Sequence, residues 1–205
     1  MSDDWAKALA NKITPGDDLV KLDHRAVLLA RWSEEARLRA SELLFKLFTD
    51  QVDAVGRELS KANRSGGLLS FLRRPQSPLT YQVKSDISFR LQTREAYGTR
   101  LEITYQQGSE PTLKIDVATQ EVINGQYCPI FRESGAVAGA QIWQEKQTLG
   151  THPDLIARLW LLLSTTAIEE GLSIDNSVIW VYADDQQPFT KSAVQTILEK
   201  LITAA

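Results

Sequence analysis

The sequence has little of what metal, redox and disulfide chemistry requires. Among its 205 residues there is one cysteine, Cys128, and there are two histidines, His24 and His152. One cysteine cannot close an intrachain disulfide, and no Cys or His pair has the spacing of metal ligands. Phosphate-binding glycine motifs and the common hydrolase and kinase signatures are also absent. We therefore predict no metal site and no cofactor, and we favour a binding protein over an enzyme.

Long hydrophobic runs are missing as well. The densest apolar stretch, at 159–163, is far shorter than the roughly 20 residues that cross a bilayer. The first twelve residues contain early acids and no continuous apolar segment, unlike a secretory signal. Together with the low cysteine content, these features predict a cytoplasmic protein without a transmembrane segment.

What remains is an ordinary globular composition, with 43% hydrophobic and 24% charged residues. We predict an α+β fold with a long N-terminal helical segment, a central antiparallel sheet of about five or six strands, and two C-terminal helices. The expected division is a helical segment over residues 1–75 and a sheet domain over residues 76–205, which fold together as one cooperative unit.

The clearest helical signal runs from Asp23 to Asn63, which contains no proline and a single glycine, Gly56. A short helix is also expected at 4–13. Forty helical residues span roughly 60 Å, so the long helix either breaks or projects from the domain. An apolar stripe on a projecting helix needs a partner. We predict that this stripe binds another protein or a second copy of the chain, through Val27, Trp32, Leu43, Leu47 and Val55.

Strand signals begin at Tyr81. Apolar and polar residues alternate over 81–92. This pattern would place Lys84 and Arg90 together on the solvent-exposed face of the strand, and Tyr81 and Phe89 on the face toward the core. Further alternating or short apolar runs lie at 101–105, 113–117, 127–132 and 140–148, and Asn124-Gly125 is typical of a hairpin turn. The short connections favour an antiparallel meander.

The last third of the chain is expected to be mostly helical. Apolar residues follow Pro153 at helical spacing up to Gly171, which predicts a helix over about 155–170. The run 177–182 reads as a buried strand, and Thr190 can cap a final helix.

Charge is distributed unevenly, although the net charge is only −3. Residues 54–100 hold 9 Lys/Arg and 3 Asp/Glu, whereas residues 101–205 hold 6 and 13. A basic strand face can follow a phosphate backbone. Nucleic-acid binding is therefore an alternative function, through Arg73, Arg74, Lys84, Arg90, Arg94 and Arg100.

Paired carboxylates give a second alternative, a carboxylate-dependent hydrolase. Glu102 and Asp116 fall on neighbouring predicted strands, and Asp184 and Asp185 follow a buried strand. Solvated strand faces and a charged loop explain the same residues more simply. The favoured prediction is a non-enzymatic intracellular binding protein, such as an adaptor, a chaperone-like factor or an inhibitor, that acts through protein–protein contacts.

Overall fold

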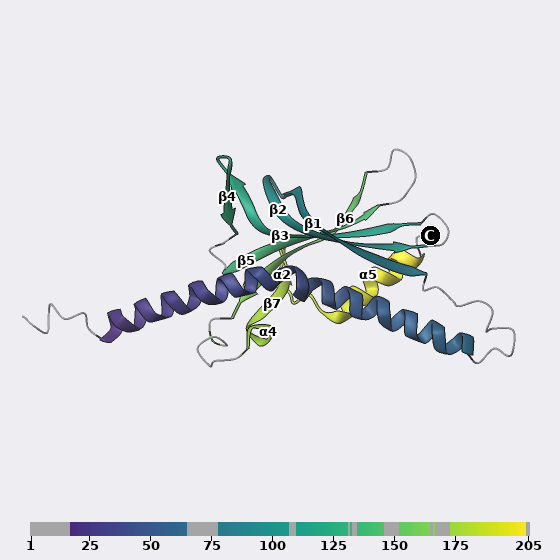
Figure 1. The fold of residues 1–205 in the computed structure, drawn as a ribbon, viewed down its shortest axis with the longest axis horizontal. Helices are drawn as coiled ribbons and strands as arrows, with labels where there is room; N and C mark the ends of the chain where they lie inside the picture. The colour runs from purple at the N-terminus through teal and green to yellow at the C-terminus, as the bar shows by residue number, and fades with distance from the viewer. Residues whose placement is uncertain are drawn as a thin grey trace, which may run out of the picture.

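The computed structural model describes residues 17–64, 78–106, 110–130, 132, 135–145, 152–164, 166 and 173–203, and within the long helix the side chains of 26–58 and 61. This part of the chain is α+β, with one long N-terminal helix, a seven-stranded antiparallel sheet and one C-terminal helix (Figure 1). The predicted class is confirmed. Within the described residues, the sheet has more strands than predicted, and one C-terminal helix is present where two were predicted.

The described elements follow one another in the order of the chain. They are α2 (Asp17–Arg64), β1 (Leu79–Leu91), β2 (Arg94–Tyr105), β3 (Thr112–Ile123), β4 (Gln126–Pro129), β5 (Ala136–Glu145), β6 (Asp154–Leu163), α4 (Ile174–Ser177), β7 (Val178–Tyr182) and α5 (Lys191–Thr203). α4 is a single helical turn. The helix predicted at 4–13 lies outside the described residues.

The sheet has the strand order β1-β2-β3-β5-β6-β7, and β4 pairs with β3 beside this path. Every pairing is antiparallel, as the short connections predicted. The turn between β3 and β4 is Asn124-Gly125, and both residues have positive φ angles, 52° and 77°. Such angles are what a two-residue hairpin turn requires.

α2 is continuous through Gly56, and its 48 residues correspond to roughly 72 Å. Figure 1 shows both of its ends extending past the sheet. Where the helix crosses the sheet, every fourth residue is buried against it. These residues are Ala36, Ala40, Leu44, Phe48 and Val52. α5 lies on the same side of the sheet (Figure 1) and adds Val194, Ile197, Leu198 and Leu201 to the same core.

The prediction of a helix over about 155–170 is wrong for its first part, because residues 154–163 form β6. β6 lies between β5 and β7, so both of its edges are paired. Leu159 and Leu161 face the helices, while Trp160 packs on the opposite side of the sheet. β6 carries apolar side chains on both faces from Leu159 to Leu163, and periodicity alone does not separate such a continuous apolar run from a buried helix.

The predicted alternation along β1 is also wrong beyond Lys84. Lys84 pairs with Arg100 whereas Ile87 pairs with Gly98, so β1 has one extra residue at this point. Asp86 has a φ of 58°, a left-handed conformation that occurs in bulges. The bulge reverses the side-chain alternation. Phe89 therefore shares a face with Lys84, and Arg90 lies on the other face, contrary to the prediction.

Candidate functional site

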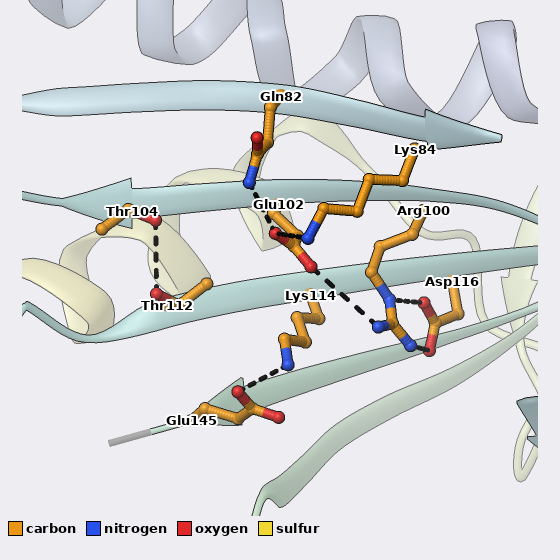
Figure 2. A network of polar contacts seen from close by, with 9 residues as sticks. All are labelled: Gln82, Lys84, Arg100, Glu102, Thr104, Thr112, Lys114, Asp116 and Glu145. Atoms are coloured by element: carbon orange, nitrogen blue, oxygen red, sulfur yellow. Dashed lines mark hydrogen bonds and ion pairs between the residues drawn. The ribbon is translucent and has the colours of Figure 1, made fainter. Parts of the chain in front are cut away.

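The sheet face opposite the helices, here called the open face, carries a network of charged and polar side chains (Figure 2). They come from four strands and belong to alternate positions that point away from α2. The network consists of Gln82, Lys84, Arg100, Glu102, Thr104, Thr112, Lys114, Asp116 and Glu145. Because three of the strands are neighbours in an antiparallel meander, side chains far apart in sequence meet here.

Arg100 and Asp116 form the centre of this network. The two residues are directly opposite on β2 and β3. Arg100 donates from Nε to Oδ1 of Asp116 at 2.5 Å and from Nη2 to Oδ2 at 3.0 Å. Such a two-pronged pair fixes both side chains. The hydrogen bond to buried Asp116 raises the pKa of Arg100 above its ordinary value, which outweighs the opposing effect of burial.

Glu102 is buried beside this pair and has three partners. Lys84 Nζ donates to its Oε2 at 2.6 Å, Gln82 Nε2 donates to the same atom at 2.8 Å, and Arg100 lies 4.0 Å from Oε1. Burial alone would raise the pKa of Glu102. The hydrogen bonds from Lys84 and Gln82 and the charges of Lys84 and Lys114 outweigh burial and hold that pKa below its ordinary value. Glu102 is thus an ionised acceptor, whereas a general acid needs a raised pKa.

A cavity of about 500 Å³ opens beside the network. Phe89 and Trp143 supply apolar lining, and His152, two residues before β6, also lines the cavity. The charged side chains of Lys114 and Glu145, which also line it, form an ion pair of 2.6 Å. The pairs Lys114–Glu145 and Arg100–Asp116 therefore neutralise four of the charged side chains that line this cavity, and Arg90 lines it as well.

The other half of the open face carries a small apolar cluster, beside which Glu121 pairs with Arg94 and Arg132. Leu91, Ala96, Ala118 and Ile130 form a small buried cluster, with Phe89 and Trp160 packed against it. The end of β1 is held over the sheet by Gln141, whose side-chain amide donates to the carbonyl of Arg90. The side chains of Leu91 and Trp160 pack directly against the backbone of Gly139. A Cβ atom added to this glycine would lie 2.5 Å from Leu91 Cδ2 and 2.6 Å from Trp160 Cζ3.

The strands at the two ends of the main strand order, β1 and β7, differ at their outer edges, and β4 forms a further edge beside β3. The outer edge of β7 is taken by the segment that follows it. Tyr182 N–H donates to Gln187 O at 2.9 Å, and Phe189 N–H donates to Trp180 O at 2.8 Å. No described residue pairs with the outer edge of β1, which is exposed along most of its length.

Backbone direction defines which groups of β1 face outward. Gln106 N–H donates to Pro78 O at 2.7 Å, so Pro78 points its carbonyl at β2. Because backbone groups alternate between the two sides of a strand, those of Gln82 also point at β2, while those of Tyr81 and Val83 point outward. The side chains of Tyr81 and Val83 are 44% and 56% exposed. This stretch offers unpaired hydrogen-bonding groups next to exposed apolar surface.

The structure brings together one of the two predicted carboxylate pairs. Glu102 and Asp116 lie on the same face of β2 and β3, with Arg100 between them. Asp184 and Asp185 lie in the exposed turn after β7, and Asp185 accepts a hydrogen bond from the backbone of Gln187 at 3.0 Å. Among the described residues, no group of three or more potential ligands could hold a metal ion.

The predicted nucleic-acid surface is divided and largely paired with carboxylates. Lys84 pairs with Glu102, Arg94 with Glu121 at 2.8 Å, and Arg100 with Asp116. The bulge places Arg90 on the other side of the strand from Lys84. Arg73 and Arg74 lie outside the described residues.

The predicted partner-binding residues of α2 are in different surroundings. Trp32, Leu47 and Val55 are partly buried and pack against the core of this chain. Leu43 is half-buried, whereas Val27 is 62% exposed. The apolar stripe is thus covered in large part by the chain's own sheet.

Comparison with known proteins gave no relative. No family model, no curated protein and no solved structure matches the chain. In the described part of the chain, no helix combines the length and the apolar character that crossing a membrane requires.

Sequence reasoning missed the exposed edge at Tyr81 and Val83, which alternation assigned to the core. Periodicity identifies the two faces of a strand, but it does not indicate whether the strand lies at an edge. Whether a strand lies at an edge depends on the order of the strands in the sheet. β1 is an edge strand because β2, β3 and β5 all lie on the same side of it.

Proposed function

We propose that the chain is a non-enzymatic binding protein that acts through protein–protein contacts, and that the outer edge of β1 is its docking surface. The observation that supports this most directly is the contrast between the outer edges of β1 and β7. β7 is closed by its own following segment, whereas β1 presents the outward backbone groups and exposed side chains of Tyr81 and Val83. An added strand satisfies such an edge through main-chain hydrogen bonds.

The charged groups of the open face support a binding role over catalysis. Each of the buried carboxylates Asp116, Glu102 and Glu121 is engaged by at least one cation. Groups paired in this way stabilise the sheet, and a catalytic acid needs a raised pKa instead. The hydrolase and nucleic-acid alternatives stay predictions with weaker support. Most of the candidate residues for these two functions that the structure describes already form ion pairs with one another or with other residues of the chain.

The docking surface can be tested by site-specific photo-crosslinking in the cells from which the chain comes. A photoreactive residue at position 83 should give a covalent adduct with a protein. The matched control is position 179 on β7, because Ile179 is 45% exposed and lies on the closed edge. Equal adducts at both positions, or none at position 83, would contradict the proposal.

A proline substitution provides a second test. Val83→Pro removes one outward N–H, and proline is tolerated on an edge strand where that N–H faces solvent. The control Val83→Thr keeps both the N–H and a β-branched side chain. We expect Val83→Pro to lose the adduct, measured with the photoreactive residue at position 81, and Val83→Thr to keep it. Circular dichroism should show that both variants are folded.

A further inference from the structure

We propose that the cavity of about 500 Å³ beside the charged network binds a small uncharged aromatic molecule that carries a hydrogen-bonding oxygen, such as an aromatic amide or a phenol. This inference goes beyond the proposed function, because it concerns a small ligand and does not depend on the edge of β1. The volume lies within the range of roughly 300–1,000 Å³ that small-molecule sites occupy. The construction of the cavity, its aromatic lining and its balance of charge define the ligand.

The cavity is enclosed by parts of the chain that are far apart in sequence. Phe89 and Arg90 come from the end of β1, which is held over the sheet because the side chain of Gln141 donates to the carbonyl of Arg90. Further lining comes from the open face of β2, β3 and β5, and Pro153 closes one side just before β6. Since paired strands position these walls, the site is preformed, as ligand sites usually are.

Two aromatic side chains supply the apolar part of the lining. Phe89 and Trp143 are both partly buried, so each leaves some of its ring surface open. Phe89 also packs against the small apolar cluster of the open face, which fixes its position. A ligand ring in this cavity would remove aromatic surface from water, and aromatic rings attract one another beyond the gain from burial. The lining therefore favours an aromatic ligand.

The charged groups of the cavity cancel in pairs (Figure 2). Arg100 and Asp116 form the two-pronged pair, and Lys114 Nζ lies 2.6 Å from the Glu145 carboxylate. Arg90 has its side chain on the face of β1 opposite to that of Phe89, so we assign its charge to the rim. A charged ligand would have to compete with one of these pairs, which is costly in a partly buried site. An uncharged ligand leaves both pairs intact.

The two cations still have N–H groups to offer to such a ligand. Nη1 of Arg100 lies 4.0 Å from Glu102 Oε1, too far for a hydrogen bond, and it donates to no other described residue. Nζ of Lys114 carries three N–H groups, and Glu145 is its one ion-pair partner in the described part of the chain. Both side chains are donors only, so the ligand must supply an acceptor, such as an amide or hydroxyl oxygen.

Three probes of similar size test the charge preference. Benzamide is uncharged, benzoate is an anion and benzylamine is a cation at pH 7. In ligand-observed NMR titrations, we expect benzamide to bind with a Kd on the order of 1 mM, a usual affinity for so small a molecule. Both ions should bind at least about fivefold more weakly. Cyclohexanecarboxamide, which keeps the amide and lacks the aromatic ring, should also bind more weakly than benzamide.

Two matched pairs of variants locate the binding. Trp143→Ala should weaken benzamide binding about tenfold, whereas Tyr127→Ala should not change it, because Tyr127 is 62% exposed on β4 and does not line this cavity. Glu145→Gln leaves Lys114 without its carboxylate, so benzoate should then bind at least about fivefold more tightly than to the unmodified chain. Asp184→Asn removes the same charge in the exposed turn and should leave benzoate binding unchanged. Circular dichroism checks that each variant is folded.

The inference is overturned if benzamide does not bind at 10 mM, or if the unmodified chain binds benzoate as tightly as benzamide. It is also overturned if Tyr127→Ala weakens benzamide binding as much as Trp143→Ala does, since the probe would then stack on any exposed ring. If Trp143→Ala does not fold, Glu145→Gln decides: unchanged benzoate binding to this variant would show that the probes bind elsewhere.

Discussion

The two faces of the sheet are stabilised in different ways. The face toward α2 and α5 is lined by apolar side chains and belongs to one large buried cluster. The open face instead carries three buried carboxylates, Glu102, Asp116 and Glu121, each of which pairs with at least one arginine or lysine. Apolar contacts are non-directional and tolerate repacking, whereas an ion pair is lost when one partner is removed. The same strands therefore depend on two kinds of interaction.

The bulge at Asp86 divides the open face in turn. Before the bulge, β1 contributes Gln82 and Lys84 to the charged network. After it, β1 contributes Phe89 and Leu91 to the small apolar cluster. One extra residue thus allows a single strand to serve a polar region and an apolar region on the same side of the sheet.

The largest expected effect lies on the helix-covered face. Phe48 is fully buried and its ring stacks with Phe189 at a centroid distance of 6.1 Å. Phe48→Ala should lower the free energy of unfolding by about 3–5 kcal/mol, because it removes a large buried side chain and leaves a cavity. Urea denaturation measures this change. Leu38→Ala is the control on the same helix, since Leu38 is 74% exposed, and a comparable loss there would show that the effect at Phe48 does not come from its burial.

The next largest effect is expected at the centre of the charged network. Asp116→Asn leaves the guanidinium of Arg100 without its two-pronged partner in a mostly buried position. We expect a loss of about 2–3 kcal/mol, somewhat below the range for a fully buried pair because Arg100 retains contact with water. Asp184→Asn, in the exposed turn, should change stability by less than about 0.5 kcal/mol. Equal effects of the two substitutions would mean that the open-face pair does not stabilise the fold.

Overpacking probes the apolar half of the open face. Gly139→Ala places a methyl group against Leu91 and Trp160, so we expect a loss of about 1–2 kcal/mol. The double variant Gly139→Ala/Leu91→Ala should be less unstable than the sum of the two single variants, because the shorter residue 91 makes room for the new methyl group. Strict additivity in denaturation experiments would show that the two residues do not touch.

The sequence predicted those elements whose pattern is set locally. The long helix, the Asn124-Gly125 hairpin and the final helix have periodicity or turn residues that do not depend on the rest of the fold. β6 was missed because its run of leucines is equally consistent with a buried helix. Only its pairing with β5 and β7 makes it a strand.

The candidate site was harder to predict for the same reason. Glu102 and Asp116 were recognised as neighbours, since both lie on clearly alternating strands. Their relation to Arg100 requires the register between β2 and β3, which the sequence does not state. The bulge at Asp86 has no clear sequence signal either, because the left-handed conformation there is adopted by an aspartate instead of a glycine.

The smallest expected effect is the pH dependence contributed by Glu102. Its partners lower its pKa in the folded chain below the ordinary value of 4.5, so its ionised form stabilises the fold. That contribution is fully present above about pH 4.5 and is lost as the pH falls through the lower, folded pKa. Since Lys84 is half exposed, the contribution should stay below about 1 kcal/mol. We expect the stability difference between the unmodified chain and Glu102→Gln, measured by urea denaturation, to shrink from pH 6 to pH 3. A difference that is constant over this range would mean that Lys84 and Gln82 do not favour the charged form of Glu102.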